Sequence, residues 1–245
     1  MGLILALERM LWTVPLPLLL MGSHLYFTVH LRGIQRHTLR GIRLSVGSGR
    51  KGNGGISAWG ALATSLAAAI GTGNIIGVAT AVALGGPGAV FWCWLTGVFG
   101  MATRYGETLV CLLHRKKNAA GENTGGAMYV MRDVLGWRRL GALFAVMGIA
   151  AAVGTGALIQ SNAIAQTLGE KGVPLLLTGI LVTAVAGAVI LGGVGSIAKV
   201  CEGLVPAMSG LYLLGCLAVL IRCGGQVLPA LKLILQSAVT PRAAG

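Results

Sequence analysis

The sequence predicts an all-α integral membrane protein, as its composition, its uncharged stretches and its charge distribution all indicate. Of the 245 residues, 55% are hydrophobic and only 10% are charged, and the mean hydropathy is +0.82. A soluble domain carries about 25% charged residues, so this chain has too little charge to cover a surface in water. The stretches without Asp, Glu, Lys or Arg are 10–31, 52–103, 140–169, 172–198 and 203–221.

These stretches predict six crossings, because a transmembrane helix needs about 20 apolar residues. The stretch 52–103 is long enough for two, and Gly85 to Gly88 with Pro87 separate them, since Gly tolerates turn dihedrals and Pro can start a helix but not continue one. Apolar residues are continuous and do not alternate, which disfavours a β-barrel. We expect helices at about 10–30, 57–84, 87–113, 139–168, 175–193 and 203–221, and a segment at 226–238 along the outer interface.

The basic residues predict the orientation. Five Lys or Arg residues lie on one side of the predicted crossings, thirteen lie on the opposite side, and Arg104 lies inside a crossing. Because positive residues remain in the cytoplasm, the larger set is expected inside and the N-terminus outside, and the net charge of +13 needs no nucleic-acid partner. The thirteen are Arg32, Arg36, Arg40, Arg43, Arg50, Lys51, Arg115, Lys116, Lys117, Arg132, Arg138, Arg139 and Lys199.

The helix at 57–84 contains two glycines around a threonine, followed by an asparagine, near the middle of the crossing. Unsatisfied backbone groups cost several kcal/mol in lipid, so a break at this depth persists only where it faces protein or a watery cavity. We expect the helix to be broken near 71–74. The carbonyls before the break can hold a small cation, and the amides after it suit a carboxylate, because a helix N-terminus carries free donors and partial positive charge. These groups are the carbonyls of Ala68, Ala69 and Ile70 and the amides of Thr72, Gly73 and Asn74.

The sequence allows two other interpretations of this glycine-rich run. In the first, Gly73 and Gly77 form a small-residue contact with a neighbouring helix. In the second, the glycines form a nucleotide-binding loop, but the spacing is one residue too long and no β-branched strand precedes it. No acid that could hold a ribose lies between Glu8 and Glu107.

The run from Ala61 to Glu107, which includes GTGNIIGVATAVALGGPGAVFW and GMATRYGETL, resembles the sodium:alanine symporter family of bacterial amino-acid carriers. GGAMYV at 125–130, IQSNAIAQ at 159–166 and IAKVCEGLVP at 197–206 are also similar. The resemblance implies a leucine-transporter-like fold of two inverted five-helix repeats preceded by an extra helix. In the single membrane domain 1–245, the helix at 10–30 would be the extra one, 57–221 the first repeat, and the second repeat would be absent.

The resemblance also implies roles for individual residues. Gly71, Thr72 and Gly73 would lie against the substrate, and Asn74 would supply a side-chain oxygen to Na⁺. Gln160 in the helix at 139–168 would be a further substrate contact, although a hydrogen bond between helices is an alternative role for Gln160 and more so for Asn162.

Glu107 is the only carboxylate that the predicted map places inside a crossing. It could be a proton relay or an ion ligand. The simpler interpretation is a structural pair with Arg104, three residues earlier on the same helical face.

The predicted function is sodium-coupled symport of alanine or glycine across the bacterial plasma (inner) membrane, with Na⁺ as the coupling ion and no organic cofactor. The expected partners are the amino acid, the lipid bilayer and a polypeptide that supplies the missing repeat. The alternative is a truncated, non-transporting membrane fragment that needs a second half. An enzyme is not predicted, because the sequence offers neither a nucleophile with its base nor a His and acid cluster for a metal other than sodium.

Overall fold

The computed structural model describes residues 2–47, 56–119, 121 and 123–240. Three residues on which the predicted orientation partly rests, Arg50, Lys51 and Arg242, lie outside them. The described chain is almost entirely helical, as predicted. Its elements are α1 (Gly2–Thr13), α2 (Pro15–His30), η1 (Ile34–His37), α3 (Thr38–Gly47), α4 (Ala58–Ala69), α5 (Thr72–Gly85), α6 (Gly88–Leu113), β1 (Lys116–Lys117), β2 (Asn123–Thr124), α7 (Ala127–Asp133), α8 (Arg138–Ala151), η2 (Ala152–Leu158), α9 (Ile159–Gly169), α10 (Leu175–Leu191), α11 (Gly193–Arg222) and α12 (Gly224–Ser237).

Four helical segments of the described chain are long and apolar enough to cross a membrane. They are Leu5–His30, Ala58–Gly85, Arg138–Gly169 and Gly193–Arg222. Helix α10 is apolar but shorter, and α6 has 26 residues but carries the Arg104–Glu107 pair. The chain is therefore an α-helical membrane protein, and the count of six crossings stays a prediction.

Small residues form the contacts between these helices. The buried residues of the described chain are Gly60, Ala63, Gly88, Ala89, Ala102, Gly106, Gly141, Thr178, Ala198, Val205 and Ala238. Large apolar side chains, by contrast, lie mostly on the outside, such as Leu191 at 90% exposure. Helices that associate in lipid pack closely through small residues, so this distribution agrees with a membrane environment.

Helix α2 packs along α6. The His24 ring nitrogen Nδ1 lies 2.8 Å from Thr103 Oγ1, which joins the two helices by a hydrogen bond. A Cβ at Gly106 would come within 3.0 Å of the Phe27 ring. The glycine on α6 therefore allows the close approach of the aromatic side chain on α2.

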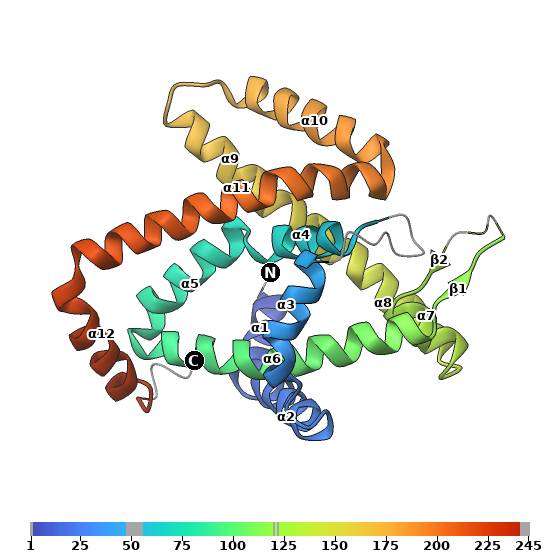
Figure 1. Ribbon diagram of the computed structural model, residues 1–245, viewed down its shortest axis with the longest axis horizontal. Helices are drawn as coiled ribbons and strands as arrows, with labels where there is room; N and C mark the ends of the chain where they lie inside the picture. Colours follow the sequence, from blue (N-terminus) through green and yellow to red (C-terminus); the bar gives the residue numbers. More distant parts are fainter. Residues whose placement is uncertain (1, 48–55, 120, 122, 241–245) are drawn as a thin grey trace.

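Helix α11 lies beside α4 and α10 (Figure 1). The predicted start of this helix, at residue 203, is wrong, because α11 begins at Gly193 and includes both Lys199 and Glu202. No ion pair joins these two side chains within the described chain. Glu202 instead accepts a hydrogen bond from the hydroxyl of Ser57, the N-cap of α4, and this contact lets the charge lie inside the helix.

The segment predicted at 226–238 forms helix α12, which packs against α6 (Figure 1). Trp92 Nε1 donates to the Ala238 carbonyl at 2.9 Å, so the end of α12 is tied to the start of α6. Its position along the membrane interface stays a prediction.

Candidate functional site

The predicted break divides the second crossing into α4 and α5. Ile70 has φ −99° and ψ 57°, and Gly71 is extended with φ −102° and ψ 163°. The interval 71–74 is not accurate, because residues 72–74 already belong to α5: Asn74 N and Ile75 N donate to the Gly71 carbonyl at 3.1 and 3.2 Å and close its first turn. With 12 residues in α4 and 14 in α5, the break lies near the middle of the span.

Gln160, from α9, fills one side of the break. Its Oε1 atom accepts hydrogen bonds from Thr72 N at 3.3 Å and from the Thr72 hydroxyl. A Cβ at Gly71 would lie 2.8 Å from Gln160 Nε2. The missing side chain at Gly71 therefore makes room for the carboxamide of Gln160, and the backbone amide of Thr72 is satisfied by protein.

Asn74 spans the break from the other side. Its Nδ2 atom donates to the Ala69 carbonyl at 2.5 Å, so it satisfies one of the carbonyls that the end of α4 leaves open. Within the described chain, the carbonyls of Ala68 and Ile70 and the amide of Gly73 have no hydrogen-bond partner. Of the amides predicted to be free for a carboxylate, only that of Gly73 is free.

The break opens into a cavity of about 970 Å³ between α4, α5, η2, α9 and α11. Gly71, Thr72, Gly73, Asn74 and Gln160 all line it, so the structure brings the predicted substrate residues and the predicted ion ligand Asn74 together. Ala68 and Ile70 line the same cavity. Ala69 contributes its carbonyl to Asn74 and is not among the lining residues.

The sequence interpretation missed two walls of this cavity. One is η2, a π-helical segment inside the span Arg138–Gly169, from which Thr155 and Gly156 line the cavity. π-Segments within α-helices frequently lie at functional sites, and the signal was a second Gly-Thr-Gly run at 154–156. The other wall is α11, with Cys201, Met208 and Tyr212 among its lining residues.

Two of the predicted site residues do not reach the cavity. Asn162 is exposed on α9 and does not line it. Glu107 lies on α6 in a separate pocket of about 340 Å³, where it pairs with Arg104 at 2.8 Å. The side chain of Glu107 is 48% exposed and that of Arg104 is 78% exposed, which favours the structural pair.

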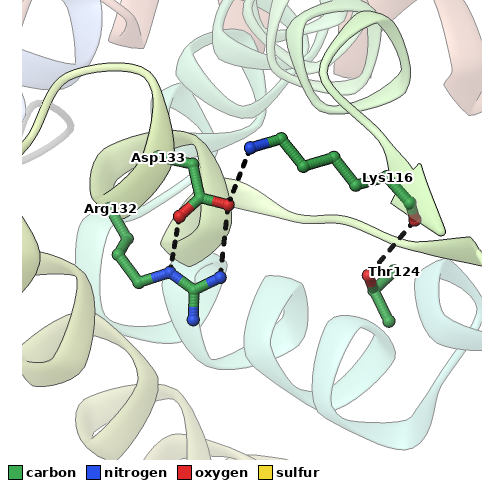
Figure 2. A network of polar contacts seen from close by, with 4 residues as sticks. All are labelled: Lys116, Thr124, Arg132 and Asp133. Atoms are coloured by element: carbon green, nitrogen blue, oxygen red, sulfur yellow. Dashed lines mark hydrogen bonds and ion pairs between the residues drawn. The ribbon is translucent and has the colours of Figure 1, made fainter. Parts of the chain in front are cut away.

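A second polar cluster, which the sequence interpretation did not single out, lies in the segment between α6 and α8 (Figure 2). The Asp133 carboxylate accepts from Arg132 Nε at 2.6 Å, from Arg132 Nη2 at 3.2 Å and from Lys116 Nζ at 3.3 Å. The hydrogen bonds from Arg132, with a smaller contribution from Lys116, lower the pKa of Asp133 to about 2. Asp133 thereby ties strand β1 to α7.

These features define the class of protein: an α-helical membrane protein in which a broken helix borders a cavity large enough for a small solute. The chain belongs to the sodium:alanine symporter family, whose family model matches residues 2–245. This is a family of transporters and not of enzymes.

Curated relatives agree with this assignment. The chain is 42% identical over 242 residues to an uncharacterized transporter of Haemophilus influenzae, covering 98% of this chain and 53% of that protein. It is 39% identical over 235 residues to the sodium/alanine symporter AgcS of Methanococcus maripaludis, covering 93% and 52%. It is 36% identical over 196 residues to a probable sodium/glutamine symporter, GlnT, of Bacillus subtilis, covering 79% and 41%. The chain thus spans about half the length of the curated relatives it matches.

Proposed function

We propose that residues 1–245 form one part of a sodium-coupled symporter for a small neutral amino acid, alanine or glycine, in a bacterial plasma membrane with the N-terminus outside. The observation that carries the proposal is the helix break at Ile70 and Gly71, which lies mid-span and faces the cavity. Broken helices at this depth commonly hold the substrate and the coupling ion of secondary transporters.

Sodium would be held by neutral oxygens. The free carbonyls of Ala68 and Ile70 supply two. The Ala69 carbonyl has a second lone pair besides the one that accepts from Asn74. With Nδ2 of Asn74 bound to Ala69, its Oδ1 remains for the ion, and no full charge is added to the middle of the membrane.

The amino acid would bind to the start of α5. The free amide of Gly73 and the positive end of the helix dipole suit the substrate carboxylate. Gln160 Oε1 is used by Thr72, so its Nε2 is the group left to donate to the substrate. The absence of a side chain at Gly73, where a Cβ would meet no atom closer than 4.0 Å, leaves room close to the backbone, which favours a small substrate.

Uptake assays test the proposal. Residues 1–245 would be joined to the second half of the Methanococcus maripaludis relative, checked for a monodisperse size-exclusion profile and reconstituted in proteoliposomes. We expect an inward Na⁺ gradient to drive uptake of labelled alanine, with glycine as a stronger competitor than glutamine. A monodisperse protein that takes up alanine equally well with K⁺ in place of Na⁺ would refute sodium coupling, and stronger competition by glutamine would refute the substrate size.

The chain by itself is expected not to transport, which is the alternative of a fragment that needs a second half. Asn74 is exposed although it spans the break, so the described residues cover only part of the ion site. Purified residues 1–245 should show no Na⁺-dependent uptake. Strong uptake by this chain alone would contradict the expectation, unless cross-linking showed that two copies together complete the site.

A further inference from the structure

A basic pocket lies away from the transport cavity, at the end of α6 where the chain enters the hairpin β1–β2. It has a volume of about 280 Å³, and its lining includes Lys116, Lys117, Arg132, His114 and Asp133. Among the described lining residues, three Lys or Arg side chains therefore face one carboxylate. This excess of positive charge suits an anionic ligand.

The basic groups are held in place by the fold. Asp133 binds both Arg132 and Lys116, and the Arg132 guanidinium lies 5.0 Å from the centre of the Tyr129 ring (Figure 2). Lys117 forms no ion pair with a described residue, so its charge is not neutralised there. Pre-positioned Arg and Lys donors of this kind bind phosphate oxygens through charge-assisted hydrogen bonds.

His114 also lines the pocket. Its Nδ1 atom lies 2.9 Å from the Val110 carbonyl, and a carbonyl only accepts, so Nδ1 carries the proton. The other ring nitrogen, Nε2, is then an acceptor in the neutral ring and is left for a donor group of the ligand.

Exposed apolar residues lie next to this pocket in the chain. Leu113 precedes His114 and is 71% exposed, while Val134 and Leu135 follow Asp133 and are 47% and 49% exposed. Trp137 is 56% exposed, and tryptophan is enriched at membrane surfaces. A ligand that carries both a phosphate and acyl chains would satisfy the basic and the apolar residues together, whereas free phosphate would satisfy only the basic ones.

We propose that this pocket binds the phosphate group of an anionic phospholipid at the membrane surface. The glycerophosphate would lie among Lys116, Lys117, Arg132 and His114, with the acyl chains against the neighbouring apolar residues. The site is independent of the transport cavity and of the function proposed for it.

Native mass spectrometry of the detergent-solubilised chain tests the proposal with three probes: short-chain phosphatidylglycerol, phosphatidylcholine with the same chains, and inorganic phosphate. We expect phosphatidylglycerol to bind more tightly than phosphatidylcholine, since each nearby basic residue contributes about five-fold in affinity for an anionic lipid. Equal binding of the two lipids would overturn the anionic site. Displacement of phosphatidylglycerol by an equal concentration of inorganic phosphate would overturn the lipid as its ligand.

Variants of Lys117 locate the site. Lys117→Gln should weaken phosphatidylglycerol binding about five-fold, whereas Lys117→Arg, which keeps the charge, should not. Lys171→Gln is the matched control, because Lys171 is equally exposed but lies in the turn between α9 and α10. Equal losses in Lys117→Gln and Lys171→Gln would show only a general charge effect and would overturn the pocket. Because Lys117 is exposed, its replacement leaves the fold intact.

Discussion

The same tripeptide, Gly-Thr-Gly, occurs twice in the middle of a membrane span and has two different structures. At the first run the helix is broken at Ile70 and Gly71 and resumes at Thr72, whereas at 154–156 the helix continues as the π-helical segment η2. Both runs line the same cavity. The tripeptide alone therefore does not decide whether the backbone opens.

The surroundings of the two runs explain the difference. Thr72 donates its hydroxyl to Gln160 on another helix, whereas Thr155 returns its hydroxyl to the Ala151 carbonyl of its own helix at 2.7 Å. Asn74 follows the first run, and its side chain donates to a carbonyl across the break. Ala157, in the same place after the second run, has no side-chain donor. A helix opens in the membrane where side chains replace the backbone hydrogen bonds that it loses.

The largest effect is expected at Asn74, the residue that the second run lacks. In the joined full-length protein, Asn74→Ala should lower the apparent Na⁺ affinity about ten-fold or more, because hydrogen bonds and ligands to charged groups contribute about 1.5–3 kcal/mol. The measurement is alanine uptake as a function of Na⁺ concentration. Arg104→Ala, at an exposed position of α6, is the control, and an equal loss there would remove Asn74 from the ion site.

A methyl group added by a Gly→Ala substitution should have different effects in the two Gly-Thr-Gly runs. At Gly71 the new Cβ would lie 2.8 Å from Gln160 Nε2, whereas at Gly156 nothing lies within 4 Å. Gly71→Ala should displace Gln160 from Thr72 and reduce alanine affinity about ten-fold, which corresponds to about 1.4 kcal/mol in total for the two hydrogen bonds that are lost. Gly156→Ala should change alanine binding less than two-fold, and similar losses in both variants would show that Gln160 does not position the substrate.

Removal of the Thr72 or the Thr155 hydroxyl should show the same difference between the two runs, with a smaller effect. Thr72→Val loses one bond to Gln160 and should raise the KM for alanine about five-fold. Thr155→Val loses only a bond within its own helix, so its KM should stay within about two-fold of the original. If Thr155→Val had the larger effect, the π-helical wall would have to be the main substrate contact.

The smallest effect is expected outside the membrane, in the Asp133 network. The folded pKa of Asp133, about 2, lies below its ordinary value of 3.8, so its contacts stabilise the hairpin above about pH 4 and are lost as the pH falls towards 2. The protection factor of the amides in 116–117, which removes the intrinsic pH dependence of exchange, should fall over this range and not between pH 5 and 8. In Asp133→Asn the protection factor should be lower already at pH 7 and should not change further towards pH 2.

The parts of the site that the sequence predicted depend on local chemistry. Glycine density and Asn74 predicted the break, and the three-residue spacing of Arg104 and Glu107 predicted their pair. Gln160 was inferred from a resemblance and not from its own pattern. In the structure it lines the cavity because it contacts Thr72, 88 residues earlier in the chain.

The parts that could not be predicted depend on contacts between distant residues. Glu202 was expected outside the helix but lies within α11, where it accepts a hydrogen bond from Ser57, 145 residues earlier, and no local pattern reveals this contact. The π-helical segment η2 differs from an α-helix only in its backbone hydrogen-bond pattern. Both kinds of helix have the same apolar composition, so the composition could not predict it. Asp133 joins the hairpin to α7 through its contacts with Lys116 and Arg132. From the sequence, these two basic residues were used only to predict the orientation of the chain in the membrane.

The hydrogen bond between Ser57 and Glu202 has a mechanical consequence. It fastens α4 to α11, while the bond between Thr72 and Gln160 fastens α5 to α9. The two halves of the interrupted helix are thus attached to different neighbours, and they are joined to each other by the backbone at Ile70 and Gly71 and by the hydrogen bond from Asn74 to the Ala69 carbonyl. We expect the distance between spin labels on α4 and α11 to stay constant when Na⁺ is added, while the distance between labels on α4 and α5 changes. A change in both distances would mean that the hydrogen bond between Ser57 and Glu202 breaks during transport.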